Sequence, residues 1–561
     1  LANGFHNYNF VNRNKNLYQD LGNLGTAIRP IFYQAPEQIG TMLGYDAYAM
    51  YAIKPSEVKY YNTKSPFSKV YYANGGAGQD ILSFDFNRNI DSLWNIGLSL
   101  QRITATKQLV GSTTTSNDNA IGHWDFMLHT NFQTKNKKYL ILAHANLTDH
   151  NSNDEGGVLK QGISYDSLLR YSTNSALLKS ASTRDKWINL HAYHEYVGYK
   201  AFQVFQVLDY QSRKSQYVDK LYSTSLSERF YAKTYSDTTA SKLAADSLYN
   251  EVNYSIFEHK SGIKGFYRGF NYRLHLRQRF LTYSNPMNNF STSKNENFLG
   301  IWLNQYFKDS TKIYAELEYL VGKDYRFKFE YQGKWLSAGF TRTYSSPTLA
   351  QQFMYNNSYR WTKTGMNNVL SDVIYASASP RVGKFVFRPS VDITRLENHI
   401  YFDQKGLVTQ TDAAIGIFRT GLGIDFRKGM FSAINQVYLT TTSGPDLVRI
   451  PKVFINSRLA LDILYAKRLY ITTGLELHYK SNYYANAYMP ATQQFYLQDT
   501  QLINGYLQAD AFADLRINRV RLFFKFSHVN SGILAPGYYA APGFAGIGRT
   551  FAMGVDWPLF D

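Results

Sequence analysis

The chain has 561 residues, with 60 Lys and Arg against 42 Asp and Glu, a formal net charge of +18 and no cysteine. Its mean hydropathy is -0.36 and no apolar run approaches the length of about 18 residues that a membrane-spanning helix needs, which excludes a helical membrane protein. The length would suit several soluble domains, yet no composition shift marks their boundaries. Aromatic residues make up 16% of the chain and Tyr outnumbers Phe, as suits a membrane interface.

Residues 1–65 differ from the rest of the chain. They carry turn residues and short apolar pieces, such as Leu21–Gly25 and Pro30–Tyr33, without sustained alternation. We interpret them as an N-terminal periplasmic or luminal lead-in segment that caps a barrel, binds a periplasmic partner or simply leads into the first strand. Leu1–Gly4 has no basic and apolar lead-in, so we take any export signal as already removed.

From residue 66 onward, apolar and polar residues alternate in short segments, and a period of two predicts β-strands. Short turns join these segments in pairs, and longer polar segments follow most pairs. The predicted strands are 68–73, 79–89, 93–104, 121–133, 139–147, 187–196, 200–208, 252–257, 267–280, 298–307, 312–320, 325–332, 335–344, 369–379, 384–394, 413–426, 430–439, 453–465, 469–479, 507–517, 520–527 and 547–559. The long polar segments are 105–120, 149–185, 211–249, 283–295, 345–367, 481–500 and 530–546.

The hairpin Leu507–Ser527 shows the pattern most clearly. A two-residue turn at Asn518–Arg519 would set Ile517 opposite Val520, and the apolar residues of both strands then share one face. The same register sets Arg516 opposite Arg521 on the polar face, which is unfavourable unless water, an anion or Asp514 relieves it.

Short turns on one side and long loops on the other are typical of outer-membrane barrels. We predict an all-β, antiparallel up-and-down barrel over residues 66–561, with 16 to 22 strands and 22 as the preferred number. Unpaired strand edges are costly in lipid, at about several kcal/mol for each unmet backbone group. The first strand must therefore pair with the last, Ile547–Leu559.

The chain end resembles the assembly signal of outer-membrane barrels, which fits Gly554, Trp557, Leu559 and Phe560, while Pro558 and Asp561 depart from it. The wider chain resembles the putative porin family of Bacteroidota. That resemblance rests on the stretches Leu21–Gly25, Lys59–Phe67, Gly75–Gly76 and Asn153–Val158. It implies an outer-membrane barrel with an inferred transport role, and barrel-assembly machinery, outer-membrane lipid and lipopolysaccharide as partners.

Basic residues gather on the polar face. Arg273, His275, Arg277 and Arg279 alternate along one strand, Lys384 and Arg388 share a face on another, and Arg516, Arg521 and Lys525 belong to the last hairpin. One hypothesis makes these nine residues pore-lining and the lumen attractive to anions. The alternative pairs the bases with Glu316, Glu318, Glu476, Asp510 and Asp514, which would leave a neutral wall.

Other chemistry has weaker signals. Arg213, Lys214 and Lys220 are candidates to face lipopolysaccharide phosphates from outside. Spread over strands, the positive charge does not suggest nucleic-acid binding. Ser527–His528 and His144 have no recognisable catalytic spacing, and Asn151–Glu155 lacks the spacing of a calcium loop. The glycine-rich runs precede no helix and are read as turns. We therefore predict no enzyme activity, cofactor or metal.

The sequence thus favours a porin-like outer-membrane channel for passive passage of small polar solutes, with anions preferred if the lumen is basic. Two alternatives stay open. One is a gated transporter with an occluded lumen, since barrels of 22 strands usually hold a plug. The other is a non-conducting barrel that serves as a subunit of a larger outer-membrane machine and contacts other outer-membrane or periplasmic proteins.

Overall fold

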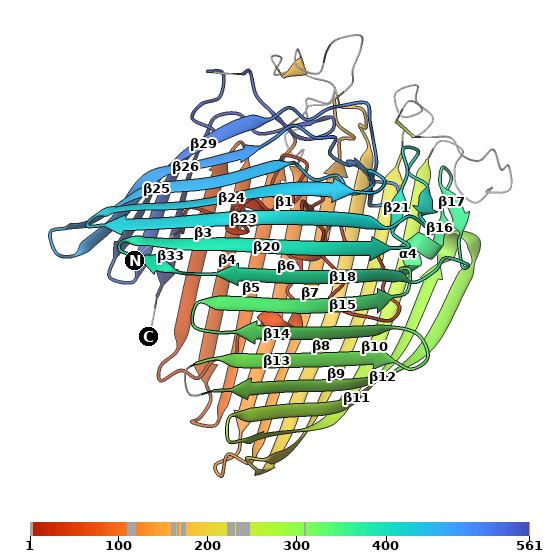
Figure 1. Cartoon of the computed structure of the whole chain (residues 1–561), viewed down its shortest axis with the longest axis vertical. Helices are drawn as coiled ribbons and strands as arrows, with labels where there is room; N and C mark the ends of the chain where they lie inside the picture. The colour runs from red at the N-terminus through yellow and green to blue at the C-terminus, as the bar shows by residue number, and fades with distance from the viewer. Residues whose placement is uncertain are drawn as a thin grey trace.

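The computed structural model describes residues 4–108, 119–158, 164, 168–169, 176–220, 230–231, 247–307, 310–533 and 535–559. These residues form one closed antiparallel barrel whose wall is a continuous sheet (Figure 1). Every strand of the wall pairs with its neighbours, and β3 pairs with β33 to close the circle. The prediction that the first strand pairs with the last is confirmed.

The wall contains 22 strands, the preferred number from the sequence. They are β3 (Phe67–Gly76), β4 (Gln79–Asn89), β5 (Trp94–Thr106), β6 (Asn119–Gln133), β7 (Tyr139–Asp154), β8 (Ala181–Tyr199), β9 (Phe202–Asp219), β10 (Leu248–Tyr267), β11 (Phe270–Asn285), β12 (Phe290–Tyr306), β13 (Lys312–Leu320), β14 (Tyr325–Gln332), β15 (Leu336–Ser345), β18 (Val369–Ala378), β20 (Phe385–Glu397), β23 (Ile415–Lys428), β24 (Phe431–Ser443), β25 (Val453–Tyr465), β26 (Leu469–Lys480), β29 (Tyr506–Ile517), β30 (Val520–Ser527) and β33 (Thr550–Pro558).

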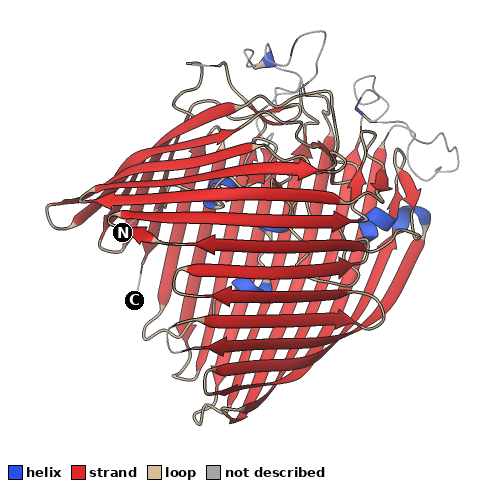
Figure 2. Cartoon of the chain, in the orientation of Figure 1, coloured by secondary structure: helices blue, strands red, loops and turns tan. Residues whose placement is uncertain are grey.

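The remaining elements are short and lie in the N-terminal region, turns and loops (Figure 2). The helices are α1 (Phe10–Arg13), η1 (Ala49–Tyr51), η2 (Pro55–Glu57), η3 (Pro286–Asn288) and α4 (Leu349–Gln352). The small strands are β1 (Tyr18–Gln19), β2 (Arg29–Pro30), β16 (Phe353–Tyr355), β17 (Arg360–Thr362), β19 (Arg381–Val382), β21 (Ile400–Phe402), β22 (Val408–Gln410), β27 (Ala487–Met489), β28 (Gln494–Tyr496), β31 (Tyr539–Ala541) and β32 (Phe544–Ala545). Among the described residues, no helix is long and apolar enough to span a membrane.

The last hairpin has the predicted register. Ile517 pairs with Val520, and Arg516 pairs with Arg521 across the turn at Asn518–Arg519. Asn518 adopts a positive φ of 53°, which a two-residue hairpin turn requires. Alternation therefore fixed the register as well as the strands.

The strands from β7 to β12 are longer than predicted. Most of 283–295, expected to be a long loop, belongs to β11 and β12, and the structure joins these strands through η3. Likewise, β8 begins at Ala181 and β9 continues to Asp219. Beyond the lipid band the outward side chains are polar, as with Arg184 and Lys186 on β8. The alternation of apolar and polar residues then disappears although the strands continue.

Candidate functional site: the luminal strap

Residues 4–66, here named the strap, run along the inner surface of the barrel before they enter β3 (Figure 1). The strap contacts inward-facing residues of β29 at its start, β25 and β12 further along, and β6 and β4 near its end. It thus passes most of the circumference of the wall. Because its contacts lie on all sides, the strap occupies the lumen.

His6 anchors the start of the strap. Its ring nitrogens lie 3.0 Å from a carboxylate oxygen of Asp514 and 3.0 Å from one of Glu476, and its backbone N–H donates to Asp514. The imidazole is fully buried and stacks on Phe512 with ring centroids 3.8 Å apart. Burial alone would lower the pKa of His6, but hydrogen bonds and attraction from the two carboxylates raise it above its usual value.

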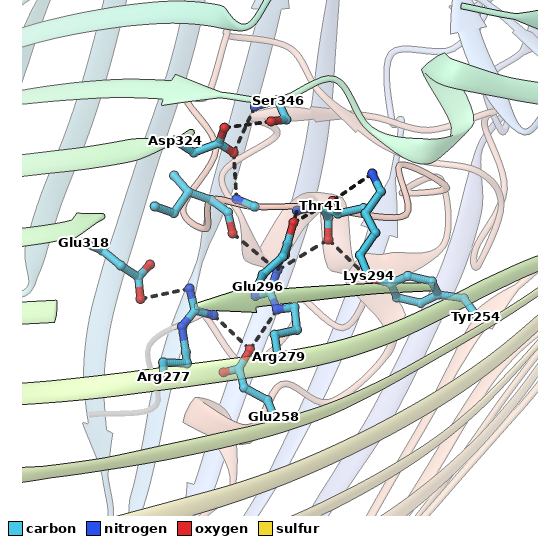
Figure 3. A network of polar contacts seen from close by, with 12 residues as sticks. Thr41, Tyr254, Glu258, Arg277, Arg279, Lys294, Glu296, Glu318, Asp324 and Ser346 are labelled. Carbon is cyan, nitrogen blue, oxygen red and sulfur yellow. Dashed lines mark hydrogen bonds and ion pairs between the residues drawn. The ribbon is translucent and has the colours of Figure 1, made fainter. Parts of the chain in front are cut away.

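The middle of the strap lies against a network of charged wall residues from β10, β11, β12 and β13 (Figure 3). Arg279 bonds Glu258 at 3.0 Å and lies 3.6 Å from Glu296. Arg277 bonds the same Glu258 at 2.9 Å and Glu318 at 3.0 Å. Both arginines are buried, so each charge depends on these partners.

The strap completes this network with its backbone. The guanidinium of Arg279 donates to the carbonyl oxygens of Ile39 and Thr41, at 3.3 and 3.4 Å. Thr41 donates from its hydroxyl to Glu296 at 2.7 Å, and the N–H of Gly40 donates to Asp324 at 2.9 Å. In Figure 3 the strap lies between Arg277 and Arg279 on one side and Asp324 on the other. Two basic residues predicted to line an open pore are therefore bonded to the strap or to acids around it.

The end of the strap is bound through tyrosines. Tyr60 contacts His144 at 2.8 Å between its hydroxyl and the ring, and Tyr61 stacks on His129 with centroids 5.9 Å apart. Thr63 follows them and donates its backbone N–H to the side-chain oxygen of Asn89 on β4, at 3.1 Å. These residues belong to the stretch Lys59–Phe67, one of the four that carry the family resemblance.

The stretch Leu21–Gly25 forms a tight turn wedged at the loop end of the barrel. Gly22 has a φ of +81°, and a Cβ there would come within 2.4 Å of the Ala545 carbonyl oxygen. Asn23 donates to the Thr106 carbonyl at 2.8 Å and accepts from Gln79 at 2.9 Å. Only glycine fits at position 22, so the sequence of this turn is matched to the loop residues that it packs against.

A cavity of about 580 Å³ lies beside this turn. Its lining includes Leu21 and Asn23 from the strap, Ala77 after β3, and 153–156 at the end of β7. Two of the four stretches that carry the resemblance, Leu21–Gly25 and Asn153–Val158, therefore meet around one cavity at the loop end.

Loops also close the barrel above the strap. A buried apolar cluster joins the strap to small hairpins inserted between wall strands, with Leu43 and Tyr45 from the strap, Met354 and Trp361 from β16 and β17, and Met489 from β27. The loop end thus has a hydrophobic core of its own.

The nine predicted pore-lining residues have different positions. Arg273, His275, Arg277 and Arg279 lie on β11, Lys384 lies in the turn before β20, Arg388 lies on β20, Arg516 on β29, and Arg521 and Lys525 on β30. Lys384 is exposed and does not share a strand face with Arg388. The turn covers 383–384, so β20 begins at Phe385, one residue after the predicted strand start.

Most of these bases have a partner. Lys525 is buried and lies 2.9 Å from Asp510, and Arg388 forms a two-pronged pair with Asp425. Arg521 lies 4.0 Å from Asp556.

The other predicted bases have aromatic or weaker contacts. Arg273 lies over the rings of Phe205 and Trp302, at 5.3 and 5.7 Å. Arg516 lies 5.3 Å from the ring of Tyr470, and His275 lies 3.9 Å from Glu318.

The five acids named in the alternative hypothesis all contact bases. Glu316 contacts Arg326, Glu318 contacts Arg277, Glu476 contacts Arg458 and His6, Asp510 contacts Lys525, and Asp514 contacts His6. Among the nine predicted bases, Arg277, His275 and Lys525 contact these acids, while Arg326, Arg458 and His6 supply the other contacts.

Other sequence candidates have structural partners. Arg213 does not face outward as expected: it is buried, pairs with Asp185 and donates to the Tyr45 carbonyl of the strap. Lys214, the next residue, pairs with Glu251. Strand alternation places adjacent residues on opposite faces, which separates the two bases.

The residues considered for catalysis or calcium binding also have hydrogen-bond partners. His528 contacts Tyr506 at 2.5 Å and the Ile547 carbonyl at 3.0 Å. The Asp154 carboxylate accepts from Ser152 and Thr183. Within the described ranges, no three His, Cys, Asp or Glu side chains gather as metal ligands.

The role of the chain end as an assembly signal remains a prediction. A Cβ at Gly554 would come 2.2 Å from the Phe523 ring, so glycine makes room for that side chain. Trp557 and Leu559 are exposed, and Phe560 lies outside the described residues.

Sequence reasoning missed the residues that bind the strap, above all His6, Gly40 and Asp324. Their partners are far away in the chain, and no local spacing marks them. The glycines of Leu21–Gly25 and the isolated His6 were the available signals, but neither identifies a partner.

Comparisons with known proteins agree with this architecture. A family described as putative porin matches residues 1–561. No curated protein matches the chain in sequence. The barrel is similar to the FrpB iron transporter from Neisseria meningitidis, with 10% identity, a TM-score of 0.62 and coverage of 89% of this chain and 82% of that one. It is also similar to the ferric yersiniabactin uptake receptor FyuA from Yersinia pestis, with 9% identity, a TM-score of 0.61 and coverage of 90% and 81%. At such identities the likeness shows the fold alone.

Proposed function

We propose that this chain, which belongs to the putative porin family, is a gated transporter of small polar solutes whose lumen is closed at rest by the strap. The chain is a 22-stranded barrel of the bacterial outer membrane. One observation carries the proposal: the strap is bonded to the wall on all sides of the lumen, from His6 at β29 to Thr63 at β4. A passive pore would need an unobstructed path along this surface.

The type of contact supports gating. Hydrogen bonds and ion pairs attach the strap at several points, as with Thr41 at Glu296 and His6 at Asp514, beside apolar contacts such as Ile39 with Phe298. Water can replace such partners when a lumen opens, so each contact contributes only about 0.5–3 kcal/mol net. Displacing the strap therefore requires no change in the wall.

The lining supports polar solutes. With the strap displaced, the exposed surface would be the network of Arg277, Arg279 and their carboxylate partners. Both signs of charge are present, which favours small polar solutes over anions alone.

The test is conductance in a planar bilayer, compared between the wild type and two glycine variants. Gly22→Val adds a side chain against the Ala545 carbonyl, whereas Gly322→Val has a similar φ of +75° and meets no atom within 4 Å. We expect little steady conductance from the wild type and from Gly322→Val, and frequent or permanent openings from Gly22→Val.

Two results would contradict gating. Large steady conductance of the wild type would indicate a passive pore. Closure of all three proteins, together with closure after removal of residues 4–60, would favour a non-conducting subunit, for which the apolar cluster at the loop end is the supporting feature.

A further inference from the structure

A second cavity, of about 110 Å³, lies inside the barrel between the strap and the last wall strands. We name it the inner cavity. Strap residues 8–12 and 18–20 line one side of it, and inward-facing residues of β26, β29 and β30 line the other. Because about 10–15 Å³ is enough for one water molecule, the inner cavity has room for a solute of several heavy atoms.

The inner cavity borders the cavity of about 580 Å³ at the loop end. Asn23, Ile547 and Gly548 line both cavities. The strap turn Leu21–Gly25 contributes residues to each of them, so it lies at their boundary. A solute that enters the larger cavity from outside would reach the inner cavity by passing this turn.

Lys480 supplies a positive charge to the inner cavity. It is the last residue of β26 and faces inward, as does Glu476 four residues earlier, which contacts His6 of the strap. Among the described residues, the ammonium of Lys480 has no hydrogen-bond acceptor and no carboxylate at ion-pair distance. Lys525 on β30, by contrast, lies 2.9 Å from Asp510.

Asp20 supplies a negative charge to the same cavity. It follows β1 directly, and its Oδ1 accepts from the backbone N–H of Gly22 at 2.9 Å, which orients the carboxylate at the start of the turn. Within the described part of the chain, no base lies at ion-pair distance from it. Burial raises the pKa of Asp20, while the Gly22 N–H and attraction from Lys480 oppose that rise. A further cation beside the carboxylate would therefore stabilise its charged form.

Tyr538 adds a hydroxyl to the lining. It directly precedes β31 and stacks on Tyr506 of β29, with ring centroids 5.3 Å apart. Burial and the nearby carboxylate of Asp20 raise the pKa of Tyr538, so its hydroxyl keeps its proton. This hydroxyl has no hydrogen-bond partner among the residues that the structure describes, so it can donate to an oxygen of a bound solute.

We propose that the inner cavity binds a small zwitterion of the amino-acid type, with its carboxylate at Lys480 and Tyr538 and its ammonium at Asp20. Lys480 and Asp20 line one cavity and attract each other, but they form no ion pair. A ligand that carries both charges gives each group a charge-assisted hydrogen bond at the same time. A ligand with a single charge leaves one of the two groups without a partner.

As the substrate site of a transporter, this assignment rests on the proposed gating, because the strap must move before a bound solute can pass. Binding itself is measured without conductance, so the two proposals fail separately. A barrel that conducts steadily but binds a zwitterion would contradict gating alone. A barrel that opens and closes but binds no zwitterion would contradict the site alone.

Titration calorimetry of the purified full chain in detergent tests the site. The zwitterions are glycine, β-alanine and 4-aminobutyrate, which differ in the separation of their charges, and the single-charge probes are acetate and methylamine. We expect at least one zwitterion to bind more tightly than either single-charge probe by about tenfold or more, as the loss of one charge-assisted hydrogen bond implies.

Two variants locate the binding. Lys480→Met and Asp20→Asn should each weaken zwitterion binding by about tenfold or more, and the asparagine keeps an acceptor for the Gly22 N–H. The matched control is Lys260→Met, because Lys260 shares the inward face of β10 with Glu258 but lines neither cavity. Its affinity should stay at the wild-type value.

The folded state of each variant is checked by its electrophoretic mobility before and after heating. The comparison of zwitterions with acetate and methylamine needs only the wild type, so it decides the question even where a variant does not fold. Absence of zwitterion binding, acetate or methylamine binding as tight as that of every zwitterion, or equal loss in Lys260→Met would overturn the proposal.

Discussion

The wall and the strap are two parts of one chain that are held in different ways. Wall strands are joined by continuous backbone ladders, as between β8 and β9 or β11 and β12. The strap contains one ladder of two residue pairs, between β1 and β2. The carbonyls of Met42 and Leu43 accept from the backbone of α4, and many of its other contacts are made with side chains of distant residues. His6, for example, is 508 positions from Asp514.

This difference explains why one part is fixed and the other is suited to move. Opening a wall ladder in lipid would expose backbone groups at about several kcal/mol each. Strap contacts are made on the inner side of the wall, so they can be exchanged without opening a wall ladder. The following changes should loosen the strap and leave the wall closed.

The largest effect is expected from Arg279→Ala. This change leaves the buried Glu296 without its arginine and Glu258 with Arg277 alone, and it removes the bonds to the carbonyls of Ile39 and Thr41. Loss of one partner from a buried pair costs about 3–5 kcal/mol. Hydrogen exchange at Gly40 and Thr41 should become much faster while exchange in the β11–β12 ladder changes little.

The matched control is Arg342→Ala. Arg342 also forms a two-pronged pair, with Asp372, but it is exposed and contacts no strap residue among those described. Exposed pairs contribute less than about 1 kcal/mol. If both variants changed exchange in the strap equally, the network around Arg279 would not be what holds it.

A smaller effect is expected from Gly75→Ala. The φ of Gly75 is not in the left-handed region, but a Cβ there would come 2.4 Å from the Tyr8 hydroxyl oxygen. Overpacking of this kind costs about 1–3 kcal/mol. The urea midpoint should fall, and exchange should increase around Tyr8.

Gly122→Ala provides the comparison, because its Cβ would meet no atom within 4 Å. Combining Gly75→Ala with Tyr8→Ala should restore part of the loss. Additive effects of the two changes would mean that Tyr8 and Gly75 are not coupled.

The smallest effect is a pH dependence at His6. The pKa of His6 is raised by its carboxylate partners despite burial, so its pairing stabilises the fold fully below the unfolded-state pKa of about 6.5. That contribution is lost as the pH rises through the higher folded-state pKa. The difference in urea midpoint between the wild type and His6→Gln should therefore shrink from pH 6 to pH 9.

A constant or growing difference would show that His6 binds Asp514 and Glu476 equally well in its neutral form. Arg458 and Lys525 lie near the same carboxylates, but both are present in the wild type and in His6→Gln, so the difference between the two proteins reports on His6.

Much of the wall was predictable because lipid imposes a simple pattern. The turn at Asn518–Arg519 and the pairing of β3 with β33 followed from alternation and from the need to close the sheet. The pattern failed where water replaces lipid on the outer face, as at Arg184 and Lys186 of β8.

The strap was not predictable for the same physical reason. Its residues show no periodic pattern, because each one packs against a different part of the wall. Arg277 and Arg279 were correctly singled out as basic residues of one strand face, but sequence alone could not show that Glu258 lies between them. Pairings between distant strands depend on the closed barrel.

Reversible locking of the strap tests the central claim most directly. Asn16 of the strap lies 3.3 Å from Asn456 of β25 between side-chain atoms, and the chain has no other cysteine to interfere with Asn16→Cys and Asn456→Cys. With Gly22→Val included to favour opening, bilayer conductance should be low while the disulfide is formed and should increase when a reductant is added. Conductance that is equally high, or equally absent, before and after reduction would contradict a strap that closes the lumen by moving.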